Sequence, residues 1–279
     1  MMGYLSLVSV NFTLNTIVFI SNTILSEESH IHSYFTLSTF GAWTLDNISI
    51  SDSIVTERVM LFNISNSILE IDNFIIQNTS FTARDLPLIT CKFISTCNFS
   101  NWSLHQVLLN DTRIISSEDG RFSLSNLTIT NSTFYSPQFI VAQRNTFVEI
   151  NIINLTQNYI TRSNLLSQFG VLLYIQSTVT LKIRDLYFKS HDFEISAFNF
   201  IAIQSSITEL LNIHFEGNSI ACESIFKVLS SPNYLMDTLT LLNNTFSTEE
   251  NQEGIKIISI DKSQGSIKYV NSTGNVMRA

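Results

Sequence analysis

The sequence is poor in charge and in the residues that bend or cross-link a chain. It has only 8 Gly, 3 Pro and 3 Cys, and charged residues fill 14% of its 279 positions. Three cysteines are too few for a disulfide scaffold. Such low charge, combined with 21 Phe, excludes an intrinsically disordered chain, which would be highly charged and poor in aromatic residues. The chain therefore has ample material for a core.

Basic residues and long apolar runs are scarce as well. Lys and Arg total 15, form no run, and leave a net charge of -8. Nucleic-acid binders carry basic patches, so we expect no nucleic-acid partner. No apolar stretch reaches the ~18 residues of a transmembrane helix, and residues 1–7 lack the basic start of a signal peptide. We expect a segment of a larger protein, which would contact a membrane only through its parent.

What the sequence does contain is a repeat of roughly 26 to 28 residues. Segments 69–81 and 122–134 share the form apolar-x-apolar-x-Asn-apolar-x-apolar-x-Asn-x-x-apolar. The apolar residue after the first Asn, here called position 1, recurs at Val10, Ile48, Phe74, Trp102, Leu127, Ile153, Leu186, Ile213, Leu239 and Ile267. Positions 3 and 8 are apolar too, with Tyr269 as the last position 3 and Gly274 the exception at position 8. Alternation at period two predicts strands.

Short strands that recur at this period cannot bury a face alone. Stacked coils about 4.8 Å apart would give each strand parallel partners above and below. The sequence therefore predicts an all-β fold, a right-handed parallel β-helix of about ten coils that forms one domain over residues 1–279. Two longer spacings, of 38 and 33 residues, predict loop insertions near 20–40 and 161–168.

Asparagine recurs at two places in the coil, before position 1 and at position 5. Because Asn tolerates the left-handed conformation of a sharp bend, it can replace the scarce Gly. Stacked in successive coils, these amides would form buried ladders. The predicted ladder residues are Asn47, Asn73, Asn101, Asn126, Asn212, Asn78, Asn131, Asn243 and Asn271. Gln143, Gln176 and Gln204 form a shorter third amide column.

The glycosylation signal Asn-x-Ser/Thr occurs twelve times, which is typical of an extracellular or cell-surface protein. Seven of the twelve coincide with predicted ladder residues, and a buried amide cannot carry a glycan. The remaining candidate acceptors are Asn11, Asn63, Asn98, Asn110 and Asn154. Cys91 and Cys97 could close a small loop across a turn, although buried free thiols are the favoured interpretation of all three cysteines, Cys222 included.

Two groups of titratable residues are candidates for a metal or catalytic site. Glu27, Glu28, His30 and His32 lie in the predicted 20–40 loop, where a solvated loop is favoured over a metal site because metal ligands need convergent support.

The second group shares one coil: Arg184, Lys189, His191 and Asp192. One coil on, Lys189 would face Glu216 and Tyr187 would face His214, and pairing across adjacent strands accounts for this group. We expect no catalytic residue, no metal ligand and no cofactor.

The coil length and Asn-rich bends resemble the pectin-lyase-like right-handed parallel β-helix. Segments 215–221 and 239–246 are similar to repeats of polymorphic outer-membrane and related surface β-helix proteins. The bias toward Asn, Ile, Phe and Ser resembles proteins of AT-rich microbial eukaryotes. The resemblance would imply a lyase or polygalacturonase for an enzyme, but the Asn-Thr-Asp, Asp-Asp, Gly-His-Gly and Arg-Ile-Lys motifs of polygalacturonases do not occur.

Two pairs of aspartates could stack as a calcium-binding lyase site would require. They are Asp46 with Asp72 and Asp85 with Asp111, and neither has a basic residue in its column to act as a base. We therefore expect a non-catalytic cell-surface or secreted structural or adhesion module that binds a protein or glycan ligand. The alternative is a polysaccharide-acting β-helix enzyme, a lyase or glycoside hydrolase, with an unrecognised active site.

Overall fold

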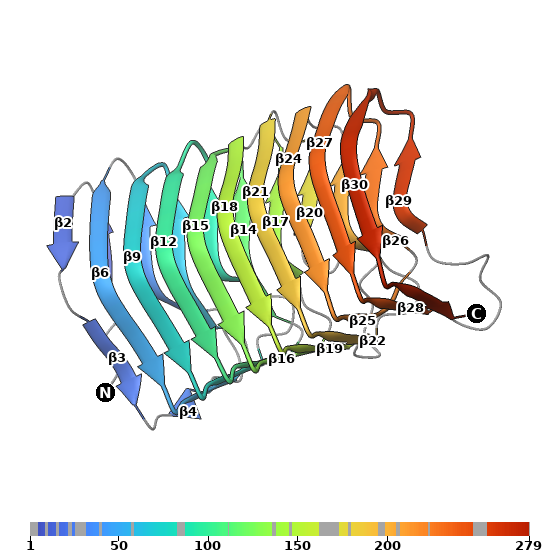
Figure 1. Cartoon of the computed structure of the whole chain (residues 1–279). Helices are drawn as coiled ribbons and strands as arrows, with labels where there is room; N and C mark the ends of the chain where they lie inside the picture. The colour runs from blue at the N-terminus through green and yellow to red at the C-terminus, as the bar shows by residue number, and fades with distance from the viewer. Residues whose placement is uncertain are drawn as a thin grey trace.

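The computed structural model describes residues 5–8, 11–14, 17–21, 24–25, 32–38, 41–56, 59–82, 87–110, 112–135, 138–144, 147–161, 173–177, 180–194, 199–204, 207–222, 224–247 and 256–278, with side chains from residue 41 onward except at residues 56, 59, 193 and 194. They form a parallel β-solenoid (Figure 1), which confirms the predicted fold class. Each coil passes in turn through three sheets, here named sheet A, sheet B and sheet C. The described residues contain no helix that could cross a membrane.

Sheet A has ten strands: β1 (Leu5–Val8), β5 (His32–Ser38), β8 (Val59–Ser65), β11 (Pro87–Lys92), β14 (Arg113–Glu118), β17 (Gln138–Gln143), β20 (Leu173–Gln176), β23 (Asn199–Gln204), β26 (Ser224–Leu229) and β29 (Lys256–Asp261). Sheet B has eleven: β2 (Asn11–Leu14), β3 (Ile17–Ser21), β6 (Ala42–Ser51), β9 (Ile68–Gln77), β12 (Thr96–His105), β15 (Arg121–Thr130), β18 (Phe147–Thr156), β21 (Thr180–Lys189), β24 (Ile207–Glu216), β27 (Asn233–Leu242) and β30 (Gly265–Thr273). Both β2 and β3 pair with β6.

Sheet C has ten short strands: β4 (Ile24–Leu25), β7 (Ile54–Thr56), β10 (Ser80–Thr82), β13 (Leu108–Asn110), β16 (Thr133–Tyr135), β19 (Tyr159–Thr161), β22 (Asp192–Glu194), β25 (Ser219–Ala221), β28 (Thr245–Ser247) and β31 (Val276–Arg278). In Figure 1 the long strands of sheet B follow one another along the solenoid, with the short strands of sheet C beneath them.

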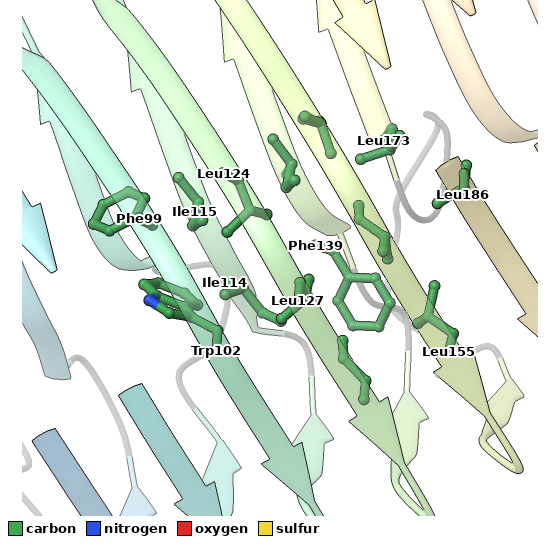
Figure 2. Close-up of a cluster of buried hydrophobic side chains, with 14 of the residues drawn as sticks. Phe99, Trp102, Ile114, Ile115, Leu124, Leu127, Phe139, Leu155, Leu173 and Leu186 are labelled. Atoms are coloured by element: carbon green, nitrogen blue, oxygen red, sulfur yellow. The ribbon is translucent and has the colours of Figure 1, made fainter. Parts of the chain in front are cut away.

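The predicted position-1 column runs unbroken through the middle of sheet B. Its members lie opposite one another in successive strands and are at most 3% exposed: Ile48, Phe74, Trp102, Leu127, Ile153, Leu186, Ile213 and Leu239. Aromatic rings reinforce the column, since the Trp102 ring meets the Phe74 ring edge to face at 4.9 Å. Figure 2 shows Trp102, Leu127 and Phe139 among the side chains that fill this core.

The register at both ends differs from the sequence prediction. Ile17, rather than Val10, lies opposite Ile48, and Val10 is outside the described residues. Val270, rather than Ile267, lies opposite Leu239, and Met277 takes position 8 in place of Gly274. Tyr269, predicted at an inward position, is 67% exposed. An apolar residue every second position fits more than one register, and pairing with the neighbouring coil decides between them.

The prediction of a loop near 20–40 is also wrong in part, because strands β4 and β5 lie within that segment. Moving position 1 to Ile17 shortens the step to Ile48, and β4 and β5 then continue the coil into sheets C and A. Of the four titratable residues expected in that loop, His32 begins β5, whereas Glu27, Glu28 and His30 lie outside the described residues. The insertion predicted near 161–168 lies outside them too, apart from Thr161 at the end of β19.

The bend asparagines adopt the expected backbone but are not buried. Asn47, Asn73, Asn78, Asn101, Asn126, Asn131, Asn212 and Asn243 all have φ between 48° and 56°. Asn73 is half-buried and the others are exposed, so the predicted burial is wrong. Bonds between coils are nevertheless present, as in Asn126 Nδ2, which donates to Asn101 Oδ1 at 2.9 Å. Asn271 lies within β30 opposite Thr240 and is exposed too. A left-handed residue at a corner points its side chain outward, and the next residue turns inward instead.

The buried polar column lies one residue beyond the bend between sheets B and C. Its members are Ser53, Thr79, Ser132, Asn158, His191, Asn218, Asn244 and Asn275, all but Asn275 at most 2% exposed. Asn218 Oδ1 accepts from the His191 N–H at 3.0 Å, and Asn218 Nδ2 donates to the Phe188 carbonyl at 3.1 Å. Each of these two bonds satisfies a backbone group of the preceding coil, as buried polar groups require.

Cys91 and Cys97 form a disulfide, which corrects the preference for free thiols. Cys91 is an inward residue of β11 and Cys97 of β12, and both are fully buried. The short turn from sheet A to sheet B brings their Cα atoms to 6.6 Å, within the range that a disulfide bridges. Cys222 is a buried free thiol, as expected.

Candidate functional site

A polar hollow lies on the outer face of sheet A. Alternation along β14, β17, β20 and β23 turns every second side chain outward. Parallel pairing then sets like positions side by side, so that Gln143 lies opposite Gln176 and Gln176 opposite Gln204. This confirms the third amide column expected from the sequence.

The hollow on sheet A has a volume of about 290 Å³. A second hollow, on sheet B, has a volume of about 310 Å³ and a different lining. Here the sheet A hollow is named the amide hollow. It is lined by Arg113, Gln138, Val141, Gln143, Tyr174, Gln176 and Gln204. Among the described lining residues, Arg113 carries a formal charge and none is a carboxylate.

One hydrogen bond within β20 and one from β17 to β20 fix the centre of the amide hollow. The Tyr174 hydroxyl donates to Gln176 Oε1 at 2.9 Å, and Gln143 Nε2 donates to the same oxygen at 3.5 Å. Because the carbonyl of Gln176 accepts both bonds, its NH₂ group is the end that can donate to a ligand. Burial raises the pKa of Tyr174, which keeps its hydroxyl protonated and able to donate.

Arg113 brings a positive charge to the edge of the amide hollow. Its Nε is buried and has no hydrogen-bond partner among the described residues. The acidic residue of the same strand, Glu118, is bound elsewhere, 2.5 Å from Arg144 Nη1. A buried donor without a partner is unfavourable.

The sheet B hollow is acidic and lies over β6, β9, β12 and β15. Thr44, Glu70, Asp72, Asn98, Ser100, Ser123 and Ser125 supply its polar lining. Asp72 Oδ1 accepts from Ser100 Oγ at 2.6 Å and from Asn101 Nδ2 at 2.7 Å. The bond from the Ser100 hydroxyl is the main cause of a lowered Asp72 pKa, which desolvation opposes.

The stacking expected of two aspartates is present on this face. Asp46 lies opposite Asp72, and Asn73 Nδ2 joins them by donating to Asp46 Oδ1 at 2.9 Å and to Asp72 Oδ2 at 3.3 Å. The described residues that line this hollow include no base. Asp85 and Asp111 lie outside the described residues. Among the described residues, no group of three or more His, Cys, Asp or Glu side chains is placed to hold a metal ion.

The titratable group on sheet B pairs as expected from the sequence. Lys189 Nζ lies 2.9 Å from Glu216 Oε2, and His214 Nε2 lies 3.3 Å from the same oxygen. The hydrogen bond from Lys189 is the largest cause of a lowered Glu216 pKa. Tyr187 and His214 are neighbours, with ring centroids 6.0 Å apart. These side chains lie on an open strand face rather than in a hollow.

Three members of the group expected around Lys189 lie elsewhere. His191 turns into the core at 2% exposed, while Asp192 and Arg184 point to solvent. The difference follows from the bend at Ser190 (φ 56°), after which the next residue faces inward. His191 is therefore part of the buried polar column and cannot share a surface site with Lys189.

The candidate glycan acceptors lie on strands. Asn63, Asn98, Asn110 and Asn154 are half-buried. Asn98 Nδ2 donates to Glu70 Oε1 at 3.4 Å. Asn11 begins β2, and its side chain is outside the described part of the chain.

Sequence reasoning found the Gln column but missed the rest of the amide hollow. Gln143, Gln176 and Gln204 repeat at one place in the coil, which is a signal that alignment of coils can detect. Arg113, Gln138 and Tyr174 have no matching residue type at the same place in neighbouring coils, so the sequence gives no signal for them. They join the lining because β14, β17 and β20 lie side by side.

No protein-family model and no curated protein sequence matches the chain. Among solved structures it is similar to the Agl-KA catalytic domain, at 10% identity and a TM-score of 0.32, and spans 62% of that domain's length with 99% of its own. It is similar to the Azotobacter vinelandii mannuronan C-5 epimerase AlgE4 A-module at 8% identity and a TM-score of 0.28, covering 99% of this chain and 91% of that one.

The Streptococcus pneumoniae surface protein and adhesin PfbA is similar at 10% identity and a TM-score of 0.22, with 96% of this chain and 89% of that one covered. Similarity at these values assigns neither a function nor a ligand to this chain.

Proposed function

We propose that this chain is a non-catalytic binding module, secreted or displayed on a cell surface, that holds a glycan along the outer face of sheet A. The observation that carries the proposal is the amide hollow itself. Four side-chain amides, a tyrosine hydroxyl and a guanidinium converge on a space of about 290 Å³. Amides both donate and accept, which suits the hydroxyl groups of a sugar.

The direction of the Gln column supports a polymer over a single sugar. Adjacent strands of a sheet lie about 4.8 Å apart, so Gln143, Gln176 and Gln204 offer the same groups at regular steps along the solenoid. An extended polysaccharide repeats its hydroxyl groups at a similar interval. The described lining residues include no carboxylate pair and no acid beside a base, a composition that suits binding rather than bond cleavage.

The disulfide supports the proposed location. Disulfides form and persist in oxidising compartments and are rare in reducing cytosol. The Cys91–Cys97 bond joins two fully buried sulfurs, which is consistent with a chain that folds during or after export.

Affinity electrophoresis and calorimetry against plant and microbial polysaccharides test this proposal. We expect Gln176→Ala to weaken binding by about 2- to 10-fold, the effect of losing one neutral hydrogen bond. Tyr174→Phe should weaken it similarly while keeping the ring. Gln157→Ala, an exposed amide at a bend outside the hollow, is the matched control and should leave binding unchanged.

The same mixtures are assayed for new reducing ends and unsaturated products. Their release by the wild-type chain would contradict a non-catalytic role and favour a lyase or glycoside hydrolase. Equal loss of binding in Gln176→Ala and Gln157→Ala would place the ligand away from the amide hollow.

A further inference from the structure

The bends present glycosylation signals on the surface, where the sequence alone had placed them in the core. Six sequon asparagines occupy left-handed bends, and each is exposed: Asn47, Asn78, Asn101, Asn126, Asn131 and Asn243. Of the strand asparagines favoured from the sequence, Asn63, Asn98, Asn110 and Asn154 are half-buried, and each lies on a strand with a neighbouring strand on both sides. Corners of the solenoid leave more room for an attached glycan than strand faces do.

Hydrogen bonds and close contacts separate Asn131 from most of the other bend residues. The amide of Asn126 donates to Asn101 Oδ1 at 2.9 Å, that of Asn101 to Asp72 Oδ1 at 2.7 Å, and that of Asn78 to Asp52 Oδ1 at 3.1 Å. The side chain of Asn243 lies against Gly274, where an added Cβ would come within 2.2 Å of Asn243 Oδ1.

Asn131 has neither constraint. In the described part of the chain its side chain forms no hydrogen bond, and only its backbone N–H is bonded, to the Thr156 carbonyl at 3.3 Å. Its neighbours along the corner are the exposed Gln106 and Gln157. The sequon is completed by Thr133, a half-buried residue at the start of β16.

We propose that Asn131 is an N-glycosylation acceptor and that its glycan projects from the corner between sheets B and C. In the reaction, Asn131 Nδ2 bonds to the anomeric carbon of an oligosaccharide carried on a polyprenyl pyrophosphate. The bond from that carbon to the pyrophosphate breaks, the lipid pyrophosphate leaves, and the amide gives up one proton. An oligosaccharyltransferase of the export pathway catalyses the step, for which Asn-x-Ser/Thr is the acceptor signal.

The fold determines which modified chains persist. A glycan on an inward amide would prevent coils from stacking, whereas a glycan at Asn131 adds to a side chain that already points to solvent. The corner residue is not part of the lining of the amide hollow, so the glycan would leave that face open. The inference requires export, which the disulfide supports, but does not require that sheet A bind a glycan.

The experiment expresses the chain behind a supplied leader in a glycosylating eukaryotic host. Secreted and retained fractions are deglycosylated in heavy-oxygen water, which converts each occupied Asn to labelled Asp, and are mapped by mass spectrometry. We expect the Asn131 peptide to be labelled in most secreted molecules. N131Q and T133A should each lose the mass of one glycan, and T133S, which keeps the sequon, should retain it.

T133A leaves the bend asparagine intact, so it keeps the test decisive if N131Q folds poorly. An unlabelled Asn131 peptide in both fractions would overturn the proposal, whatever the occupancy of Asn63 or Asn154. Binding to sheet A is measured on deglycosylated protein, so the two proposals fail independently.

Discussion

His191 is a titratable side chain in a buried column whose other polar members carry amides or hydroxyls, and in which Val107 takes the place between Thr79 and Ser132. The ring atom Nδ1 of His191 accepts a hydrogen bond from the backbone N–H of Asn158 at 3.1 Å. The backbone N–H of His191 donates to Asn218 Oδ1 at 3.0 Å. Protonation of Nδ1 would replace that acceptor with a donor facing another donor. Burial lowers the pKa of His191 from 6.5 to about 4, although the backbones of Leu155 and Asn158 oppose the shift.

This shift makes stability depend on pH in a defined direction. The folded chain binds fewer protons than the unfolded chain between pH 6.5 and about 4, so the unfolding free energy falls as the pH is lowered through that window. The full loss, reached below about pH 4, is about 3 kcal/mol. His191→Asn, which matches the amides at Asn158 and Asn218, should remove most of that dependence when denaturant unfolding is followed from pH 7 to 4. A parallel pH profile in wild type and variant would contradict this assignment.

At the level of structural elements, the buried polar column joins successive coils at the corner between sheets B and C. Asn218 shows how one amide serves three coils. It accepts from His191, donates to the Phe188 carbonyl, and donates to Asn244 Oδ1 at 2.8 Å. Removing this amide would leave the buried backbone N–H of His191 and carbonyl of Phe188 without their hydrogen-bond partner.

Asn218→Ala should therefore lower the free energy of unfolding by about 1 to 3 kcal/mol, the cost of leaving buried polar groups unsatisfied. Asn233→Ala is the matched control, because Asn233 is exposed at the start of β27 and surface substitutions stay within about 0.5 kcal/mol. Urea unfolding of the two variants measures the difference. Equal effects would show that the column contributes nothing specific.

The repeat in the sequence predicted the apolar columns well because burial selects for the same property in each coil. It could not place the polar column, whose members Ser132, Asn158 and His191 differ in chemistry while sharing a position. Periodicity also marks Asn131 and Ser132 alike as bend residues, and only the left-handed backbone at Asn131 decides which of them faces the core. The Gln column was visible as a repetition, whereas Arg113 and Tyr174 enter the amide hollow through packing.

Over the whole molecule, the described strands of each coil pair with strands of the coils on either side of it. The strand orders of the three sheets run monotonically along the solenoid, and each inner strand therefore has two parallel partners. Strands β29, β30 and β31 have a partner on one side only. Their apolar side chains reflect this position, because Val270 is 55% and Met277 59% exposed, while Leu239 and Phe246 in the coil before them are fully buried.

Stability in such a stack is a sum of coil and interface contributions, so it need not be uniform along the chain. We expect amide hydrogen exchange to be slowest in β12, β15 and β18, which have described neighbours on both sides, and fastest in β29, β30 and β31. Exchange followed by mass spectrometry on peptic fragments at pH 7 measures the gradient. Asn218→Ala should steepen it by speeding exchange in β24 and its neighbours while leaving β12 unchanged. Exchange at one common rate in all three sheets would mean instead that the solenoid opens only as a single cooperative unit.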